Sequence, residues 1–223
     1  MKKFNEFIEQ YKNENDSIEI LNHYVESGDF IRDLKRLNDA DLEGIAKRST
    51  IHTNRFAKIV LTSHLGYKMR FHIWPVMEVN QYHEPHNHRW DFNSYVLTGT
   101  MVNRIVQENE NNEKRFLHCK SLPMQVGKNR EYQTLGPKGL ERIEDQIIEQ
   151  GNSYEMKHEI IHIAKIPKNT LTSTLFITSP AKKDYSDLYM PDLKNPPSDV
   201  KLPPFQPNEL RKRIEEIVEV IER

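Results

Sequence analysis

Residues 82–99 read Tyr-His-Glu-Pro-His-Asn-His-Arg-Trp-Asp-Phe-Asn-Ser-Tyr-Val-Leu-Thr-Gly. Within this stretch His86 and His88 are two positions apart, and His83 lies just upstream. In an extended segment, residues i and i+2 project from the same face, about 6.5 Å apart along the strand. Two imidazoles can therefore reach one divalent ion without a bend in the backbone. Pro85 has a fixed φ and no N–H, which suits a strand entry or edge. The stretch predicts a metal site.

The composition is that of a globular protein with a real core. The chain has 223 residues, of which 36% are hydrophobic and 29% charged, and its formal net charge is -1. This balance gives no reason to expect a nucleic-acid partner or an acidic membrane surface. The N-terminus lacks the apolar run of a secretory signal, and no stretch approaches the ~20 apolar residues of a membrane span.

Cys119 is the only cysteine, which rules out an internal disulfide and fits a reducing compartment. We therefore expect a cytoplasmic protein with no membrane and no nucleic-acid partner, acting on a small-molecule substrate.

Helical patterns fill residues 1–50, and a change of period follows. In the helical part Asp16 is a candidate N-cap, Gly28 a helix end, and Asn38 the cap of a short last helix. After Thr50 apolar residues alternate with polar ones, most clearly over Tyr67–Trp74. Strands are expected over 56–62, 67–74, 94–107, 114–121, 152–157, 160–166 and 171–178, and 139–149 is ambiguous between helix and strand. Such short, regularly spaced strands predict a mainly β sandwich or barrel.

The C-terminal part combines prolines with one amphipathic helix. Prolines recur beyond Pro180, which predicts an extended strap, and a helix is expected from Asn208 with an apolar stripe from Leu210 to Ile221. This stripe packs on the barrel or forms a homodimer contact, with packing favoured. The resulting organisation is a helical segment at 1–50, a β-barrel with the metal site at 51–182, and the strap and helix at 183–223.

A histidine pair needs at least one more protein ligand to hold a catalytic metal well. The best candidate is His162, which opens an alternating segment. His158 has the same strand parity as His162 but lies in the more polar residues before the strand, so it is the second choice. His83 is expected to be a loop residue or a neighbour of the ligands, since Pro85 interrupts its strand.

The order His86-x-His88, Gly99 and then His162 before a β-rich segment resembles the two-motif signature of the cupin superfamily. The resemblance covers roughly residues 55 to 180 and implies a jelly-roll barrel, the double-stranded β-helix. In most cupins a glutamate four or five residues after the histidine pair is a further ligand. Here Phe92 and Asn93 occupy those positions.

Because it lacks this glutamate, the chain resembles the cysteine and thiol dioxygenase branch of the superfamily, whose iron is held by three histidines. This resemblance implies His86, His88 and His162 as ligands. It does not extend to the substrate residues, because Cys119 lies too far downstream to match the crosslinking cysteine of cysteine dioxygenase.

Several further residues are candidates for supporting the ligands or binding substrate. Asp91 or Asn93 could accept the free N–H of a ligating imidazole. A substrate carboxylate could be held by Arg70, His72 or Arg104, although an outward-facing charge is the favoured interpretation for each. His52 and Asn54, just before the first core strand, are expected in a polar turn, with a place at the barrel mouth as the alternative.

The leading hypothesis is a mononuclear non-haem Fe(II) dioxygenase acting on a small polar, thiol- or amino-acid-like metabolite. Imidazole also suits zinc, nickel and manganese, so a non-redox isomerase, lyase or bond-forming enzyme is a second hypothesis. A third is a non-catalytic cupin that binds a ligand for sensing or assembly.

Overall fold

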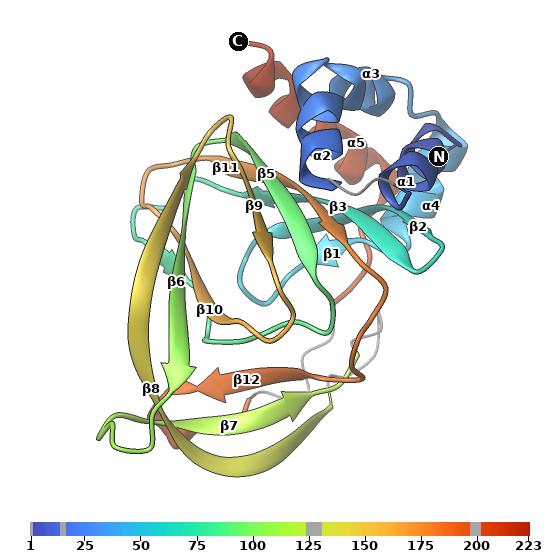
Figure 1. The fold of residues 1–223 in the computed structure, drawn as a ribbon. Coiled ribbons are helices and arrows are strands. Elements are labelled where there is room, and N and C mark those ends of the chain that lie inside the picture. Colours follow the sequence, from blue (N-terminus) through green and yellow to red (C-terminus); the bar gives the residue numbers. More distant parts are fainter. Residues whose placement is uncertain (1, 14–16, 124–130, 197–201) are drawn as a thin grey trace.

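Two antiparallel six-stranded sheets curl toward each other, and α-helices cover the outer face of one of them (Figure 1). The computed structural model describes residues 2–13, 17–123, 131–196 and 202–223. This arrangement confirms the expected mainly β jelly roll with helices at both ends of the chain. The candidate cap Asp16 lies outside the described residues.

The helical segments follow the expected apolar periods. They are α1 (Lys2–Tyr11), α2 (Ser17–Glu26), α3 (Asp29–Lys35), α4 (Asp39–Ala46), the 3-10 helix η1 (Pro191–Leu193) and α5 (Pro207–Ile221). Asn38 caps α4 as predicted, because its side chain accepts a hydrogen bond from the Asp41 backbone N–H at 2.9 Å.

The first sheet carries the helices. Its strands, in spatial order, are β1 (Thr50–Ile51), β2 (Ala57–His64), β3 (Tyr67–Trp74), β11 (Thr172–Thr178), β5 (Phe92–Thr98) and β9 (Ser153–Met156). The order mixes early and late strands, so residues distant in sequence become neighbours in space.

The second sheet closes the other side of the barrel. Its strands, in spatial order, are β12 (Ser186–Met190), β7 (Arg115–Ser121), β8 (Tyr132–Glu149), β6 (Thr100–Glu108), β10 (Ile161–Ile166) and β4 (Gln81–Tyr82). The ambiguous stretch 139–149 is therefore strand. The buried thiol of Cys119 lies on β7.

The strands of the first sheet present one face to the helices and the other to the barrel interior. On β3, Met69 and Phe71 join the core shared with the helices, whereas Arg70 and His72 line the interior cavity. The apolar face of the predicted alternation is thus covered by helices, and the polar face looks inward instead of toward solvent. The helices shield from solvent the outer face of the first sheet, which would be exposed if the barrel stood alone.

Gly99 makes the turn that joins β5 to β6. Its φ is +73°, and a Cβ at this position would lie 2.5 Å from the carbonyl oxygen of Leu171. Only glycine fits such a close approach without a backbone shift.

The strap expectation is wrong for one segment, because residues 186–190 form strand β12, paired with β7. The C-terminal helix is confirmed, and Leu210, Ile214 and Ile217 are buried in the core that α1–α4 share with the first sheet. The apolar stripe is therefore occupied within the chain.

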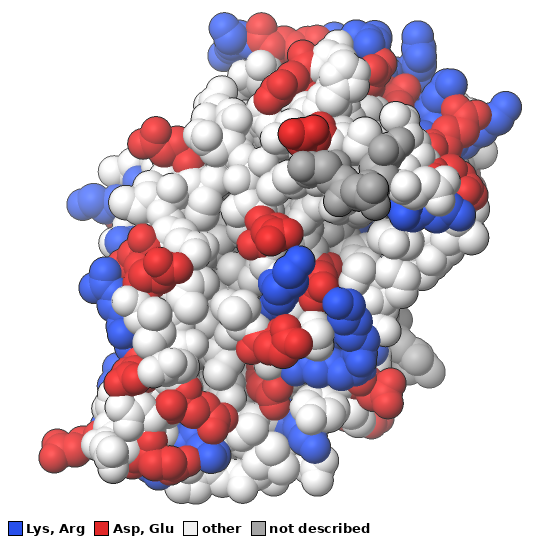
Figure 2. Space-filling model, in the orientation of Figure 1, with Lys and Arg blue, Asp and Glu red and all other residues white. Residues whose placement is uncertain are grey.

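The surface shows mixed charge. Figure 2 shows acidic and basic side chains interspersed over the visible face, in keeping with the net charge of -1. None of the helices in the described part of the chain combines the length and apolar character that a bilayer crossing needs.

Candidate metal centre

His86, His88 and His162 meet inside the barrel, although 74 residues separate the last two. His86 and His88 lie in the loop that follows β4, and His162 lies on β10. The loop is held against β10 by two backbone hydrogen bonds, from His86 N to His162 O at 3.0 Å and from His162 N to His86 O at 2.9 Å. The expected convergence of imidazoles from two separate segments is present in the structure.

The three rings are close enough for one cation. One ligand atom from each histidine lies within 4.8 Å of the others, and the Nε2 atoms of His88 and His162 are 3.0 Å apart. Two nitrogens bound to one metal at about 2.1 Å are about 3–3.4 Å apart at common coordination angles. The donor spacing therefore fits a mononuclear site.

Burial favours the neutral form of His88 and His162, the form that a metal ligand requires. The pKa values of His88 and His162 are held well below the usual value, first by burial and then by the neighbouring histidines. A neutral imidazole keeps one nitrogen lone pair for a cation.

Two oxygen acceptors set which nitrogen carries the proton. His86 Nδ1–H donates to the carbonyl oxygen of Glu84 at 2.7 Å, and His162 Nδ1–H donates to Oδ1 of Asn103 at 3.2 Å. Because these acceptors have no proton to give, both rings keep the Nε2 lone pair for the centre of the site.

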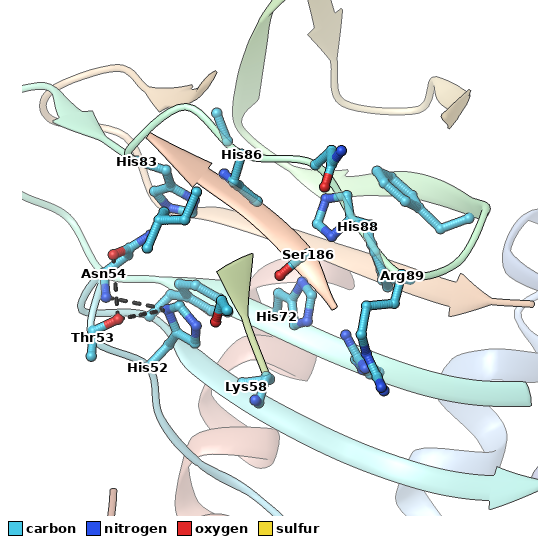
Figure 3. Close-up of a pocket in the computed structure, with 18 of the residues that line it drawn as sticks. His52, Thr53, Asn54, Lys58, His72, His83, His86, His88, Arg89 and Ser186 are labelled. Carbon is cyan, nitrogen blue, oxygen red and sulfur yellow. Dashed lines mark hydrogen bonds between the residues drawn. The ribbon is translucent and has the colours of Figure 1, made fainter. Parts of the chain in front are cut away.

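A cavity of about 640 Å³ opens beside the three histidines. Figure 3 shows His86 and His88 on one wall, with His72 and Lys58 across from them. This volume matches that of a small-molecule site.

Three of the further candidates line this cavity. Arg70 and His72 project into it from β3. His83 is also buried there, but its Nε2 accepts a hydrogen bond from Trp74 Nε1 at 3.2 Å, and its ring stacks on Phe56. Burial, followed by the charge of His86, lowers the pKa of His83 to about 3. The structure places His83 beside the three-histidine group and outside it.

The other candidates lie away from the three histidines. Asp91 accepts hydrogen bonds from His158 Nδ1 at 2.8 Å and Lys182 Nζ at 2.6 Å, so the expected role for Asp91 beside a ligating ring is wrong. His158 belongs to this separate cluster. Asn93 does not accept the N–H of a ligating imidazole either, since its side-chain amide donates to Ser17 on the helical side of the first sheet.

Arg104 lies outside the cavity, so it takes the outward-facing position and not the substrate-binding one. Its guanidinium forms a two-pronged ion pair with Asp145 on β8, with N–O distances of 2.8 and 3.0 Å. The reason is strand parity, because Val102 and Arg104 share the outward face of β6 while Met101 and Asn103 point inward.

Sequence reasoning missed the residues that support the histidine loop. Asn87, between the two loop histidines, is buried and donates from Nδ2 to Asp187 on β12 at 2.8 Å. The turn at His52 and Asn54 lines the cavity, in agreement with the alternative place at the barrel mouth (Figure 3). The sequence did contain one signal for the contact with Asp187, the position of Asn87 between the two histidines. In an extended segment the side chain between residues i and i+2 points to the opposite face, so Asn87 must contact a different part of the protein from the histidines.

No family model matches the sequence, and the search of curated proteins finds no relative. Among solved structures, the DMSP lyase DddQ from Ruegeria pomeroyi is similar at 10% identity and a TM-score of 0.37. That alignment covers 61% of this chain and 53% of the lyase.

Two further solved structures are similar at the same level. An oxalate oxidase is 14% identical with a TM-score of 0.34, covering 70% of this chain and 62% of that chain. KdgF from Halomonas sp. is 10% identical with a TM-score of 0.32, covering 57% of this chain and 81% of that chain. At scores this low the likeness carries no argument, so the jelly-roll assignment rests on the strand order described above.

Proposed function

We propose that this chain is a metal-dependent enzyme that holds one divalent cation on His86, His88 and His162 and transforms a small polar metabolite in the adjacent cavity. The observation that carries the proposal is the set of three convergent imidazoles in the barrel interior. A structural role for the cation is disfavoured, because three ligands leave coordination positions directed at a cavity of about 640 Å³.

Fe(II) is the favoured ion, and oxidation of the metabolite by dioxygen is the favoured reaction. Three neutral ligands leave the charge of the cation uncompensated, which favours an anionic, chelating substrate. A bound Fe(II) would supply redox chemistry, whereas Zn(II) on the same ligands would supply Lewis-acid chemistry. The protein's own part is to hold the rings, to exclude bulk water and to orient the substrate through the polar cavity wall.

The first experiment measures the metal content of protein purified without added ions. We expect about one ion per chain in the wild type and less than about one-tenth of that in His86→Ala and His162→Ala, because two imidazoles hold a cation poorly. The matched control is His23→Ala, an exposed histidine on α2 far from the cavity. Full metal content in a correctly folded His86→Ala variant would contradict the site.

The second experiment separates the two chemistries. Oxygen uptake is recorded with a panel of thiols, amino acids and other small acids, using protein loaded anaerobically with Fe(II) or with Zn(II). The oxidation proposal expects uptake only with Fe(II) and a substrate. Tight zinc occupancy and no uptake across the panel would favour the non-redox alternative.

A further inference from the structure

Three cationic side chains gather at one end of the cavity. Lys68 and Arg70 project inward from β3, and Arg89 directly follows the ligand candidate His88. In Figure 3 the Arg89 side chain extends from the histidine loop toward the strands of the first sheet. All three line the same cavity, where the only acidic lining residue in the described part of the chain is Glu84.

Two buried donors at this cluster are unused in the part of the chain that the structure describes. Nε of Arg70 and Nε1 of Trp90 are buried, and neither has a hydrogen-bond partner among the residues that the structure describes. Trp90 also lines the cavity, and the Arg70 guanidinium lies 4.6 Å from the centre of its ring. Buried donors without an acceptor destabilise a protein, so such a pair indicates an acceptor that the described part of the chain does not supply.

The positive charges are only partly compensated, by the more distant carboxylate of Asp184 beside Arg89. In the described ranges no carboxylate lies within ion-pair distance of Lys68, Arg70 or Arg89. Burial, followed by the charge of Arg89, lowers the pKa of Arg70 to about 10, and burial followed by Arg70 and Arg89 lowers the pKa of Lys68. The guanidinium of Arg70 is still charged at neutral pH, so the cluster keeps an excess of positive charge.

The cluster lies next to the metal centre. The ring of Trp90 is 5.9 Å from the ring of His88. The Arg70 guanidinium lies 5.7 Å from the ring centre of Phe176, a further aromatic neighbour of that histidine. One small molecule can therefore contact the cationic cluster and the three histidines at the same time.

We propose that Lys68, Arg70, Arg89 and Trp90 form a subsite for a doubly charged oxyanion, a phosphate ester or phosphonate head group. Guanidinium groups bind such oxygens through paired N–H donors. A carboxylate carries a single negative charge and leaves most of the cluster uncompensated, whereas a phosphate group carries about −1.5 to −2 at pH 7. The assignment of this head group to the substrate rests on the proposed function, but the anion site itself does not.

The test is calorimetric titration of the full chain, stripped of metal by a chelator, with inorganic phosphate, methylphosphonate and acetate at low ionic strength. We expect phosphate and methylphosphonate to bind at least about tenfold more tightly than acetate, because one additional charge-assisted hydrogen bond gives about that ratio. Equal binding of acetate would overturn the choice of a doubly charged ligand, and no binding of any of the three would overturn the subsite.

Variants locate the bound anion. Arg70→Gln and Arg89→Gln should each weaken phosphate binding about tenfold or more, and Arg89, which is only half-buried, keeps the test usable if Arg70→Gln folds poorly. Arg104→Gln is the matched control, since this arginine lies on the same barrel outside the cavity. Unchanged phosphate binding in both pocket variants would overturn the proposal.

The metal and anion proposals can fail separately. His86→Ala should lose metal and keep phosphate binding, and Arg70→Gln should keep metal and lose phosphate binding. Loss of phosphate binding in metal-free His86→Ala would place the anion on the histidines and overturn the subsite. A chain that binds phosphate but no metal would overturn the proposed function alone.

Discussion

Asn103 holds the third histidine in a useful state. It is fully buried on β6, and its Oδ1 accepts the Nδ1 proton of His162 at 3.2 Å. This contact leaves the Nε2 lone pair of His162 facing Nε2 of His88. Without an acceptor the ring could turn or change its protonated nitrogen, and the donor set would lose its geometry.

We expect Asn103→Leu to weaken metal binding about 10- to 100-fold, as the loss of an outer-shell partner of a ligating histidine usually does. The measurement is competition with a chromophoric chelator on folded protein. Asn103→Asp is the matched variant, because it retains an oxygen acceptor, and it should bind metal at least as tightly as the wild type. A leucine variant with unchanged affinity would show that Asn103 does not position the ring.

The histidine triad could be predicted from sequence, but its supports could not. The spacing of His86 and His88 is short and depends only on the strand period, and His162 stands out in an apolar alternating segment. Asn103 meets His162 only because β6 and β10 pair with Ala164 opposite Asn103. Register between strands nearly sixty residues apart depends on the whole barrel, and the local pattern of either strand does not contain it.

The face of β3 shows a second limit of the pattern. Alternation correctly separated Met69 and Phe71 from Arg70 and His72, but it could not tell which set faced solvent. In this barrel the interior holds a cavity, and the outer face of the first sheet is covered by helices. The polar set is therefore the inner one.

Strand β12 closes the barrel behind the histidine loop. Leu188 forms a β-bridge with His86, and the backbone N–H of Tyr189 donates to the carbonyl oxygen of Pro85 at 2.9 Å. Asp187 accepts side-chain hydrogen bonds from Asn87, His118 and Lys183, each between 2.8 and 2.9 Å. Burial raises the pKa of this carboxyl group, but these bonds outweigh it and lower the pKa below the usual value. The strand was missed because it is short and is followed at once by prolines.

We expect Asp187→Ala to weaken metal binding although all three histidines remain, because the loop between them loses its anchor on β12. The free energy of unfolding should fall by about 2–3 kcal/mol, since a charged acceptor with several donors is removed from a mostly buried place. Metal titration and urea unfolding measure the two effects. Asp145→Ala removes a carboxylate from the outer face of the same sheet and should leave metal affinity unchanged. Equal metal affinity in both variants would contradict a positioning role for β12.

The helices and the barrel share one hydrophobic core. The cluster that contains Phe4, Leu21 and Phe30 of the helices also contains Ile59, Phe71 and Leu175 of the first sheet. The rings of Phe30 and Phe71 meet edge to face, with their centres 5.7 Å apart. Phe71 stands on β3 between Arg70 and His72, so the helical layer directly backs the wall of the cavity.

Both tryptophans of the chain, Trp74 and Trp90, line the cavity. The long α-helices, by contrast, lie in the layer outside the barrel. Tryptophan fluorescence therefore reports on the site, and far-ultraviolet circular dichroism reports largely on the helices. If the shared core makes them one cooperative unit, the two transitions in urea should coincide. Phe30→Ala, made outside the barrel, should destabilise the protein by about 3–5 kcal/mol and shift both transitions equally. The control is Val79→Ala, an exposed apolar side chain whose removal should change stability by less than about 0.5 kcal/mol. A Phe30→Ala variant that loses helical signal while tryptophan fluorescence stays native would show instead that the barrel and its site stand without the helices.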